Sequence, residues 1–102
     1  MEQVVQIERS IDGFSVKGVL TFDTVLSAYE ISKPFFLQKQ TLHVNLIAVT
    51  HSDSAGLSLL ARWMRLAKTH NIGLVFSGLP DSMLDLSRVS GLDEILPIQH
   101  RT

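Results

Sequence analysis

Residues 49–60 read VTHSDSAGLSLL and hold an imidazole, a carboxylate and several hydroxyls within a few positions. A serine hydrolase uses these side chains to remove the proton from a nucleophilic hydroxyl, so His51, Asp53 and Ser54 are the first candidates for a catalytic triad. Residues this close together at the junction of a strand and a helix rarely form such a chain of hydrogen bonds. Ser52 and Ser54 also lack the two flanking glycines of a nucleophile elbow. The cluster therefore does not predict a hydrolase.

The sequence contains none of the common motifs for other catalytic or cofactor-binding sites. The chain has no cysteine, no glycine-rich phosphate-binding motif and no pair of histidines at metal-ligating spacing. The histidines are interpreted as surface or structural residues: His43, His51, His70 and His100. The acids near the C-terminus are interpreted as helix caps and solvated side chains: Asp81, Asp85, Asp93 and Glu94. We expect no metal, no cofactor and no enzymatic activity.

Composition indicates one small domain, which we expect to comprise residues 1–102. Apolar residues make up 45% of the chain, enough for a hydrophobic core. The net charge of −1 and the lack of a basic run argue against nucleic acid as a partner. No apolar run approaches the ~20 residues that span a bilayer, and the N-terminus does not read as a signal peptide. We expect a cytoplasmic protein that does not insert into the membrane itself.

The elements that would position the 49–60 cluster follow the order β-β-α-β-α-β-α. An Asp-Gly turn predicts an opening hairpin, and each later strand–helix–strand unit predicts parallel pairing. The expected strands are Val4–Arg9, Gly13–Leu20, Leu42–Val49 and Leu74–Phe76. The expected helices run from Thr24 to Ser32 or Lys33, from Leu57 to His70, and from Asp81 or Ser82 to Ser90. This order predicts an α/β fold with a small mixed sheet of about four strands and three to four helices, mainly on one face.

Within this order, the cluster lies where a strand passes into the central helix. Asp53 or Ser54 can offer an oxygen to the free backbone amides at the helix start, and Gly56 permits close approach of the backbone. Asp23 offers a similar cap to the first helix. The free amides and the dipole at a helix N-terminus also favour a phosphate group there. Ser54 could therefore be phosphorylated, or its unmodified hydroxyl could contact a partner.

The central helix has more apolar surface than a helix packed on one side requires. At ~100° per residue its apolar arc is roughly 220° wide, against the ~100° stripe typical of a surface helix. Leu59, Trp63 and Leu66 account for the excess. Either they pack under a neighbouring helix, or they form an exposed docking strip with Arg62 and Arg65 at its rim. In the second case, Trp63→Ala should weaken partner binding with little loss of folding.

The stretch from His43 to Leu57 resembles the signature of STAS domains, in which an apolar strand precedes Asp-Ser/Thr-x-Gly-Leu at the start of a helix. Phe14–Thr21 and Ile72–Gly78 are similar to two other strands of that family, and the resemblance covers about residues 10–98. Three further segments are similar to the MlaB-type subunits of Mla phospholipid-transport ABC systems: 66–68 (LAK), 86–87 (LS) and 95–97 (ILP).

The resemblance implies a STAS-like fold and a non-enzymatic accessory subunit. Its partner would be the ATPase of a phospholipid ABC transporter within a membrane complex, which would hold the chain at the periphery of the inner membrane. The motif match assigns the partner-binding or phosphorylatable role to Ser54, with Asp53, Ala55 and Gly56 beside it. The alternative is an anti-sigma-factor antagonist that binds an anti-sigma factor with kinase activity and is regulated by phosphorylation of Ser54.

Overall fold

The chain alternates strands and helices in the order that the sequence predicts. The computed structural model describes residues 4–37 and 40–99. Its strands are β1 (Val5–Ser10), β2 (Gly13–Leu20), β3 (Thr41–Ser52), β4 (Gly73–Ser77) and β5 (Ile98–Gln99). Its helices are α1 (Val25–Ser32), α2 (Ser54–Thr69) and α3 (Asp81–Ser90), with 3-10 turns η1 (Lys33–Leu37) and η2 (Leu92–Glu94).

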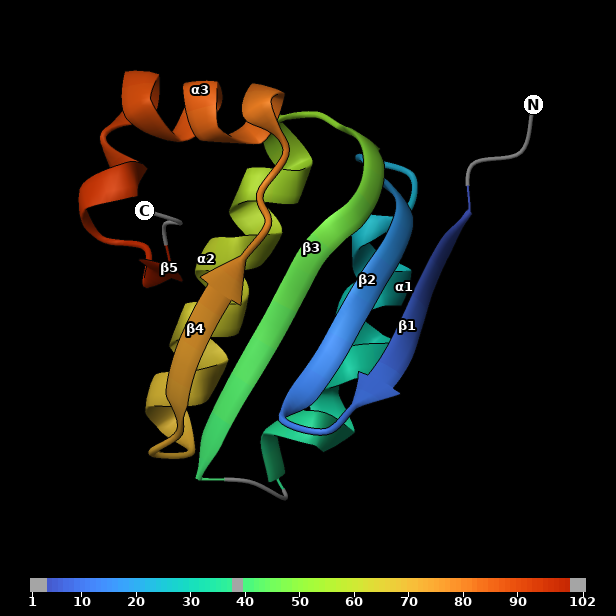
Figure 1. Cartoon of the computed structure of the whole chain (residues 1–102), viewed down its shortest axis with the longest axis vertical. Coiled ribbons are helices and arrows are strands. Elements are labelled where there is room, and N and C mark those ends of the chain that lie inside the picture. Colours follow the sequence, from blue (N-terminus) through green and yellow to red (C-terminus); the bar gives the residue numbers. More distant parts are fainter. Residues whose placement is uncertain (1–3, 38–39, 100–102) are drawn as a thin grey trace.

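The strands form one mixed sheet in the order β1-β2-β3-β4-β5 (Figure 1). β1 pairs antiparallel with β2, and the remaining neighbours pair in parallel, which confirms the hairpin and the strand–helix–strand units. The sequence predicts about four strands. The additional strand is β5, which pairs Ile98 with Phe76 and Gln99 with Ser77. β3 also continues to Ser52, so the first part of the 49–60 cluster is strand.

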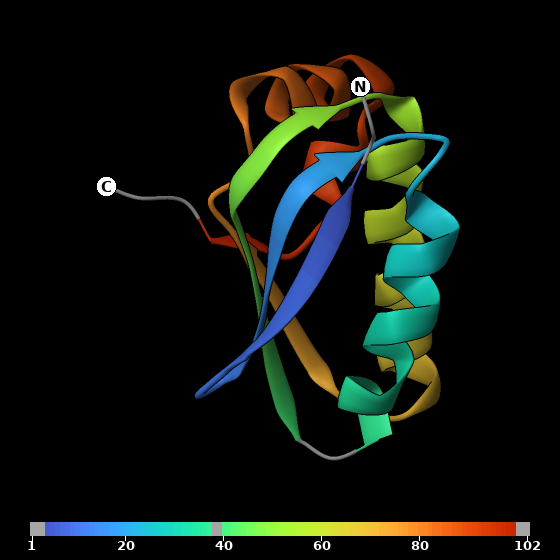
Figure 2. The same cartoon turned by 90° about the vertical axis from the view of Figure 1, so that its right-hand side faces the viewer.

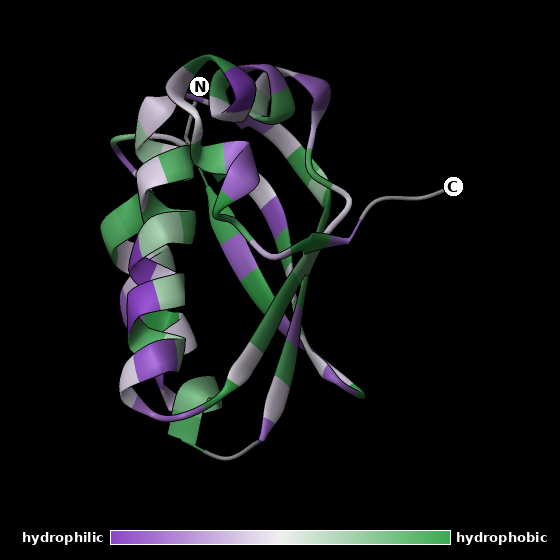
Figure 3. Ribbon diagram, turned by 90° about the vertical axis from the view of Figure 1, so that its left-hand side faces the viewer, coloured by the Kyte–Doolittle hydropathy of each residue, from purple (hydrophilic) through white to green (hydrophobic). Residues whose placement is uncertain are grey.

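The two helices that follow β2 and β3 cover the same face of the sheet. Figure 2 shows α1 and α2 side by side on that face, with α3 crossing one end of the molecule. In Figure 3 the helices carry both hydrophobic and hydrophilic residues, as expected for helices that bury one side. The predicted fold class is confirmed: a small mixed sheet with its helices mainly on one face.

The helix ends agree only in part with the capping expected from sequence. From the sequence, Asn71 and Gly73 are expected to end the central helix, as residues that tolerate positive φ, and Gly91 to end the third. Asn71 and Gly91 have positive φ after α2 and α3, but Gly73 does not and is the first residue of β4. No side chain caps the first turn of α1 or α3, so the predicted capping roles of Asp23 and Asp81 are wrong. Other loop contacts hold the start of α1, as described below for the site.

The indole of Trp63 lies at the centre of the core and is fully buried. Its ring centroid is 5.4 Å from that of Phe14 on β2 and 6.3 Å from that of Phe76 on β4. Its Nε1 donates a hydrogen bond of 2.7 Å to Ser32 Oγ at the end of α1. Trp63 therefore joins α2 to the sheet through its ring and to α1 through its nitrogen.

This position resolves the two interpretations of the wide apolar arc. Helix α2 contacts α1 on one side and α3 on the other, in addition to the sheet. Leu59 is 2% exposed, Trp63 is completely buried, and Leu66 is partly buried against the core. The exposed docking strip is therefore wrong, because the sheet and the neighbouring helices together cover this apolar surface.

We predict that Trp63→Ala strongly destabilises the fold, contrary to the expectation for a docking residue. Emptying a large buried site costs about 3–5 kcal/mol in the free energy of unfolding, a large share of the ~5–15 kcal/mol available to a small domain. Urea unfolding followed by circular dichroism measures the loss. Leu26→Ala, at a side chain 66% exposed, is the control and should change stability by less than ~0.5 kcal/mol. Equal unfolding midpoints for the two variants would contradict a core role for Trp63.

Candidate functional site

The corner between β3 and α2 is organised by the carboxylate of Asp53. Asp53 is the N-cap of α2, with extended backbone angles, and its Oδ1 accepts a hydrogen bond of 2.8 Å from the Ala55 amide. Its own amide donates to the Leu20 carbonyl at 3.2 Å, and its carbonyl accepts from the Gly56 amide at 3.0 Å. These bonds satisfy amides that a helix start leaves free, so the predicted capping role of Asp53 is confirmed.

The second oxygen of Asp53 holds the loop between β2 and α1. Its Oδ2 accepts a hydrogen bond of 3.2 Å from the Phe22 amide. In the same loop Thr24 Oγ1 accepts from the Thr21 amide at 3.0 Å and donates to the Val19 carbonyl at 2.6 Å. The loop is thus fixed on both sides, although its Phe22 side chain is 83% exposed. One carboxylate joins the helix start to an exposed aromatic residue 31 positions earlier in the chain.

Gly56 allows α2 to start directly against the end of β2. A Cβ atom at this position would lie 2.9 Å from the Leu20 carbonyl oxygen and 3.2 Å from Cε of Met83. The first distance is too short for a carbon atom against fixed backbone, so a larger residue would push the helix start away. The requirement for glycine in the motif is therefore steric. It does not come from an unusual backbone angle, since Gly56 is not among the residues with positive φ.

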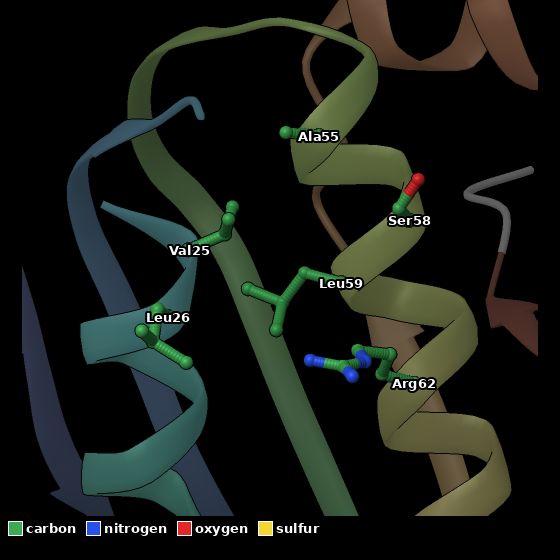
Figure 4. Close-up of a pocket in the computed structure, with 6 residues that line it drawn as sticks. All are labelled: Val25, Leu26, Ala55, Ser58, Leu59 and Arg62. Carbon is green, nitrogen blue, oxygen red and sulfur yellow. The ribbon is translucent and has the colours of Figure 1, made fainter. Parts of the chain in front are cut away.

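An apolar groove runs between α1 and the first turns of α2 (Figure 4). Its volume is about 250 Å³, and its lining residues are Val25, Leu26, Ala55, Ser58, Leu59 and Arg62. Figure 4 shows Leu59 extending from α2 toward Val25 and Leu26 on α1. The Ser58 hydroxyl donates to the Ser54 carbonyl at 3.2 Å, so it is bonded within its own helix. The groove can accept an apolar side chain, and its lining residue Leu26 is exposed. Phe22, whose amide bonds to Asp53 at the same corner, is a second exposed apolar residue.

A second hollow, of about 180 Å³, continues along the same two helices. Its lining residues are Tyr29, Arg62, Arg65, Leu66 and Thr69. The guanidinium carbon of Arg62 lies 5.3 Å from the centroid of the Tyr29 ring, a cation–π distance. Arg62 lines both hollows, so the apolar groove ends at a positively charged group.

The structure brings together most of the residues that the sequence singles out. Asp53, Ala55 and Arg62 contribute directly to the corner or to the groove, and Ser54 is an exposed residue at the first position of α2. Leu59 forms part of the groove wall, although almost none of its surface is exposed. Trp63 belongs to the core and cannot contact a partner, so its assignment to the site is wrong.

Sequence reasoning misses the contribution of the β2–α1 segment to the site. Phe22 and Leu26 are the most exposed apolar residues beside the start of α2. The available signal was an aromatic residue at the centre of a polar turn, TFDT, where no core residue is expected. Its proximity to Asp53 depends on tertiary structure and has no counterpart in local spacing.

Two sets of residues combine an acid, a histidine and a hydroxyl, as a catalytic triad would. Asp53 uses both carboxylate oxygens on backbone amides, so it does not orient His51 as a triad would require. A different combination forms across β3 and β4, where His43 Nε2 lies 3.0 Å from Ser77 Oγ. His43 Nδ1 lies 3.6 Å from the exposed carboxylate of Asp12, an ion pair only when the imidazole is protonated. This agrees with the interpretation of His43 as a satisfied structural histidine.

Residues 4–37 and 40–99 contain neither a cluster of metal ligands nor a helix that could span a membrane. Among residues 4–37 and 40–99, no three histidine or acidic side chains gather so as to hold a metal ion. His100, one of the four histidines interpreted from sequence, lies outside these ranges. None of the helices in this part of the chain is both long and apolar enough to cross a membrane.

The family can be identified by comparison with known proteins. The model of the family described as "Mlab, STAS domain" matches residues 4–97. The chain belongs to this family. The Asp53-Ser54-Ala55-Gly56-Leu57 corner described above is thus the corner of a STAS domain, and the resemblance seen in the sequence is confirmed. No curated protein matches the chain by sequence.

Solved structures support the same fold. An anti-sigma factor antagonist from Mycobacterium paratuberculosis superposes with a TM-score of 0.74 at 20% identity, covering 98% of this chain and 87% of that one. The anti-sigma factor antagonist SpoIIAA in its unphosphorylated form gives a TM-score of 0.73 at 17% identity, covering 97% and 89%. At these identities the likeness establishes the STAS fold.

We predict that Asp53→Ala destabilises the protein by about 1–2 kcal/mol, because it removes a helix cap and a second backbone contact. Asp53→Asn should cost less, since its one remaining side-chain oxygen can still cap α2 but the Phe22 amide loses its acceptor. Urea unfolding measures both changes. The control is Asp23→Ala, which alters an exposed acid that makes no cap and should change stability by less than ~0.5 kcal/mol. An equal effect of Asp23→Ala and Asp53→Ala would refute the bridging role.

Proposed function

We propose that the chain is a non-enzymatic accessory subunit that binds the ATPase of an Mla-type phospholipid ABC transporter and supports its assembly or activity. The contact surface would comprise the Ser54 helix start, the apolar groove and the exposed side chains of Phe22 and Leu26. The observation that carries the proposal is this surface on a chain whose family is described as MlaB-type. Through the ATPase, the subunit would lie on the cytoplasmic side of the inner membrane.

The chain exposes apolar side chains that its core does not use. Trp63, Leu59 and Leu60 already fill the space between α2 and the rest of the molecule. Phe22 and Leu26 are exposed outside that core, on backbone that is fixed by the bonds of the β2–α1 loop for Phe22 and by helix α1 for Leu26. Rigid, exposed apolar residues beside a groove are typical anchors of protein interfaces, because their burial in a complex costs little conformational entropy.

The second candidate function is an anti-sigma-factor antagonist regulated by phosphorylation of Ser54. Ser54 is exposed at the first position of a 16-residue helix, where a phosphate would meet the positive end of the helix dipole. The likeness in fold to two anti-sigma factor antagonists favours the same possibility. The two functions share one surface and differ in the partner that covers it.

We predict that Phe22→Ala and Leu26→Ala each weaken binding to the ATPase subunit at least about tenfold, as expected for interface anchors. Isothermal titration with the purified ATPase gives the dissociation constants. Val89→Ala is the matched control, because Val89 is 88% exposed and lies on α3, away from the groove. Unchanged affinity for both groove variants would place the contact elsewhere on the chain.

We also predict that Ser54→Arg abolishes co-purification with the ATPase, because a bulky cation would occupy the centre of the contact. Ser54→Ala should preserve the fold, measured by urea unfolding, since Ser54 is exposed and its hydroxyl makes no hydrogen bond among the described residues. Co-purification of Ser54→Arg at the wild-type level would exclude the helix start from the interface. Phosphorylation of Ser54 by a partner kinase, with no binding to the ATPase, would select the second function instead.

A further inference from the structure

The two hollows between α1 and α2 have different linings, one mainly apolar and the other cationic. The first is lined mainly by aliphatic side chains, and the second by two arginines, a tyrosine and a threonine beside Leu66. Arg62 belongs to both, so the hollows are adjacent. A ligand that followed both helices would therefore pass from an apolar region to a cationic one.

The cationic region has no neutralising partner within the described part of the chain. Neither Arg62 nor Arg65 forms an ion pair there, and the Arg62 guanidinium lies over the Tyr29 ring. On the same pair of helices, Glu30 of α1 pairs with Lys33 at 3.4 Å, and Asp53 at the N-cap of α2 accepts from two backbone amides. The two guanidinium groups can thus donate to an external carboxylate, for which their planar geometry is well suited.

We propose that this surface recognises a helix of the partner ATPase that carries an apolar anchor and, one to two turns away, an acidic residue. The anchor would enter the groove at Leu26 and Leu59, and the carboxylate would meet Arg62 and Arg65. On α2, Leu59 lies one turn before Arg62 and nearly two turns before Arg65, which is about 4.5 to 9 Å at the helical rise and matches one to two turns of a partner helix. The inference rests on the proposed function and specifies the chemistry of the segment that binds.

Charge and apolar contact have separable roles in this arrangement. Burial of the anchor supplies affinity that depends little on salt. The arginine–carboxylate contacts favour one register of the partner helix and accelerate association, and exposed contacts of this kind are screened by ions. The variant Arg62→Glu/Arg65→Glu should therefore lose both affinity and salt dependence, while a groove variant such as Leu26→Ala should lose affinity and keep the salt dependence.

The test measures binding of the full chain to the purified ATPase subunit by isothermal titration, at low and high salt of about 0.05 and about 0.5 M. We expect Arg62→Glu/Arg65→Glu to weaken binding at least about tenfold at low salt, and to flatten the salt dependence. The control Lys68→Glu/Arg88→Glu makes the same change in net charge at exposed positions outside both hollows. If the charge reversal perturbs circular dichroism, Arg62→Gln/Arg65→Gln replaces it, with the same expected direction and a smaller effect.

The outcomes distinguish this inference from the function on which it rests. In a charge swap, the Arg62→Glu/Arg65→Glu chain is titrated with an ATPase variant in which one acidic residue is replaced by lysine. Recovered binding in this combination would establish the pairing. Wild-type affinity and salt dependence in both arginine variants would overturn the inference, while the proposed function would stand on the binding itself. Equal losses in the arginine variant and in Lys68→Glu/Arg88→Glu would also overturn it, since net charge alone would explain them. If the wild-type chain does not bind the ATPase, the proposed function fails and the inference fails with it.

Discussion

The fold depends on the placement of one indole ring between the sheet and its two covering helices. Trp63 packs against aromatic rings from β2 and β4, and its nitrogen donates to Ser32 on α1. Because a buried indole N–H without a partner is costly, this hydrogen bond fixes where α1 lies beside α2. The groove between the helices is a consequence, since its two walls are held at a distance set by the core beneath them.

At the surface, the carboxylate of Asp53 fixes the segments on both sides of the corner. Its carboxylate has two oxygens, and each one holds a different segment: the first turn of α2 and the loop before α1. The motif residue therefore serves stability and site geometry together. Gly56 completes the corner by allowing the helix to begin against the Leu20 carbonyl, so the neighbouring Ser54 is presented at a fixed position. The corner is thus held by hydrogen bonds among its own residues and by the bond from the Asp53 amide to the Leu20 carbonyl of β2.

Local sequence patterns were sufficient for much of the fold. The Asp-Gly pair at the hairpin, the β-rich runs and the glycine after α3 act over a few residues, so the hairpin, the parallel strands and the end of α3 could be predicted, although the turn itself is Ile11–Asp12 and Gly13 is the first residue of β2. The position of Trp63 could not, because a helical wheel shows which residues share a side but not how many neighbours the helix has. Phe22 was missed for a related reason. Its link to Asp53 joins segments 31 residues apart, and no spacing rule connects them. The two-residue β5 is too short to leave a recognisable pattern.

The burial of Trp63 has a practical consequence for studying the chain. It is the single tryptophan of the sequence, and its ring has no exposed surface. Its emission therefore reports on the interior, where α1, α2 and the sheet meet, and a ligand seated among Phe22, Leu26 and Ser54 would leave the ring in the same surroundings. Detachment of α1 would instead admit water to the indole and shift the emission to longer wavelength. Trp63 fluorescence is thus an intrinsic probe of folding that does not respond to binding at this surface.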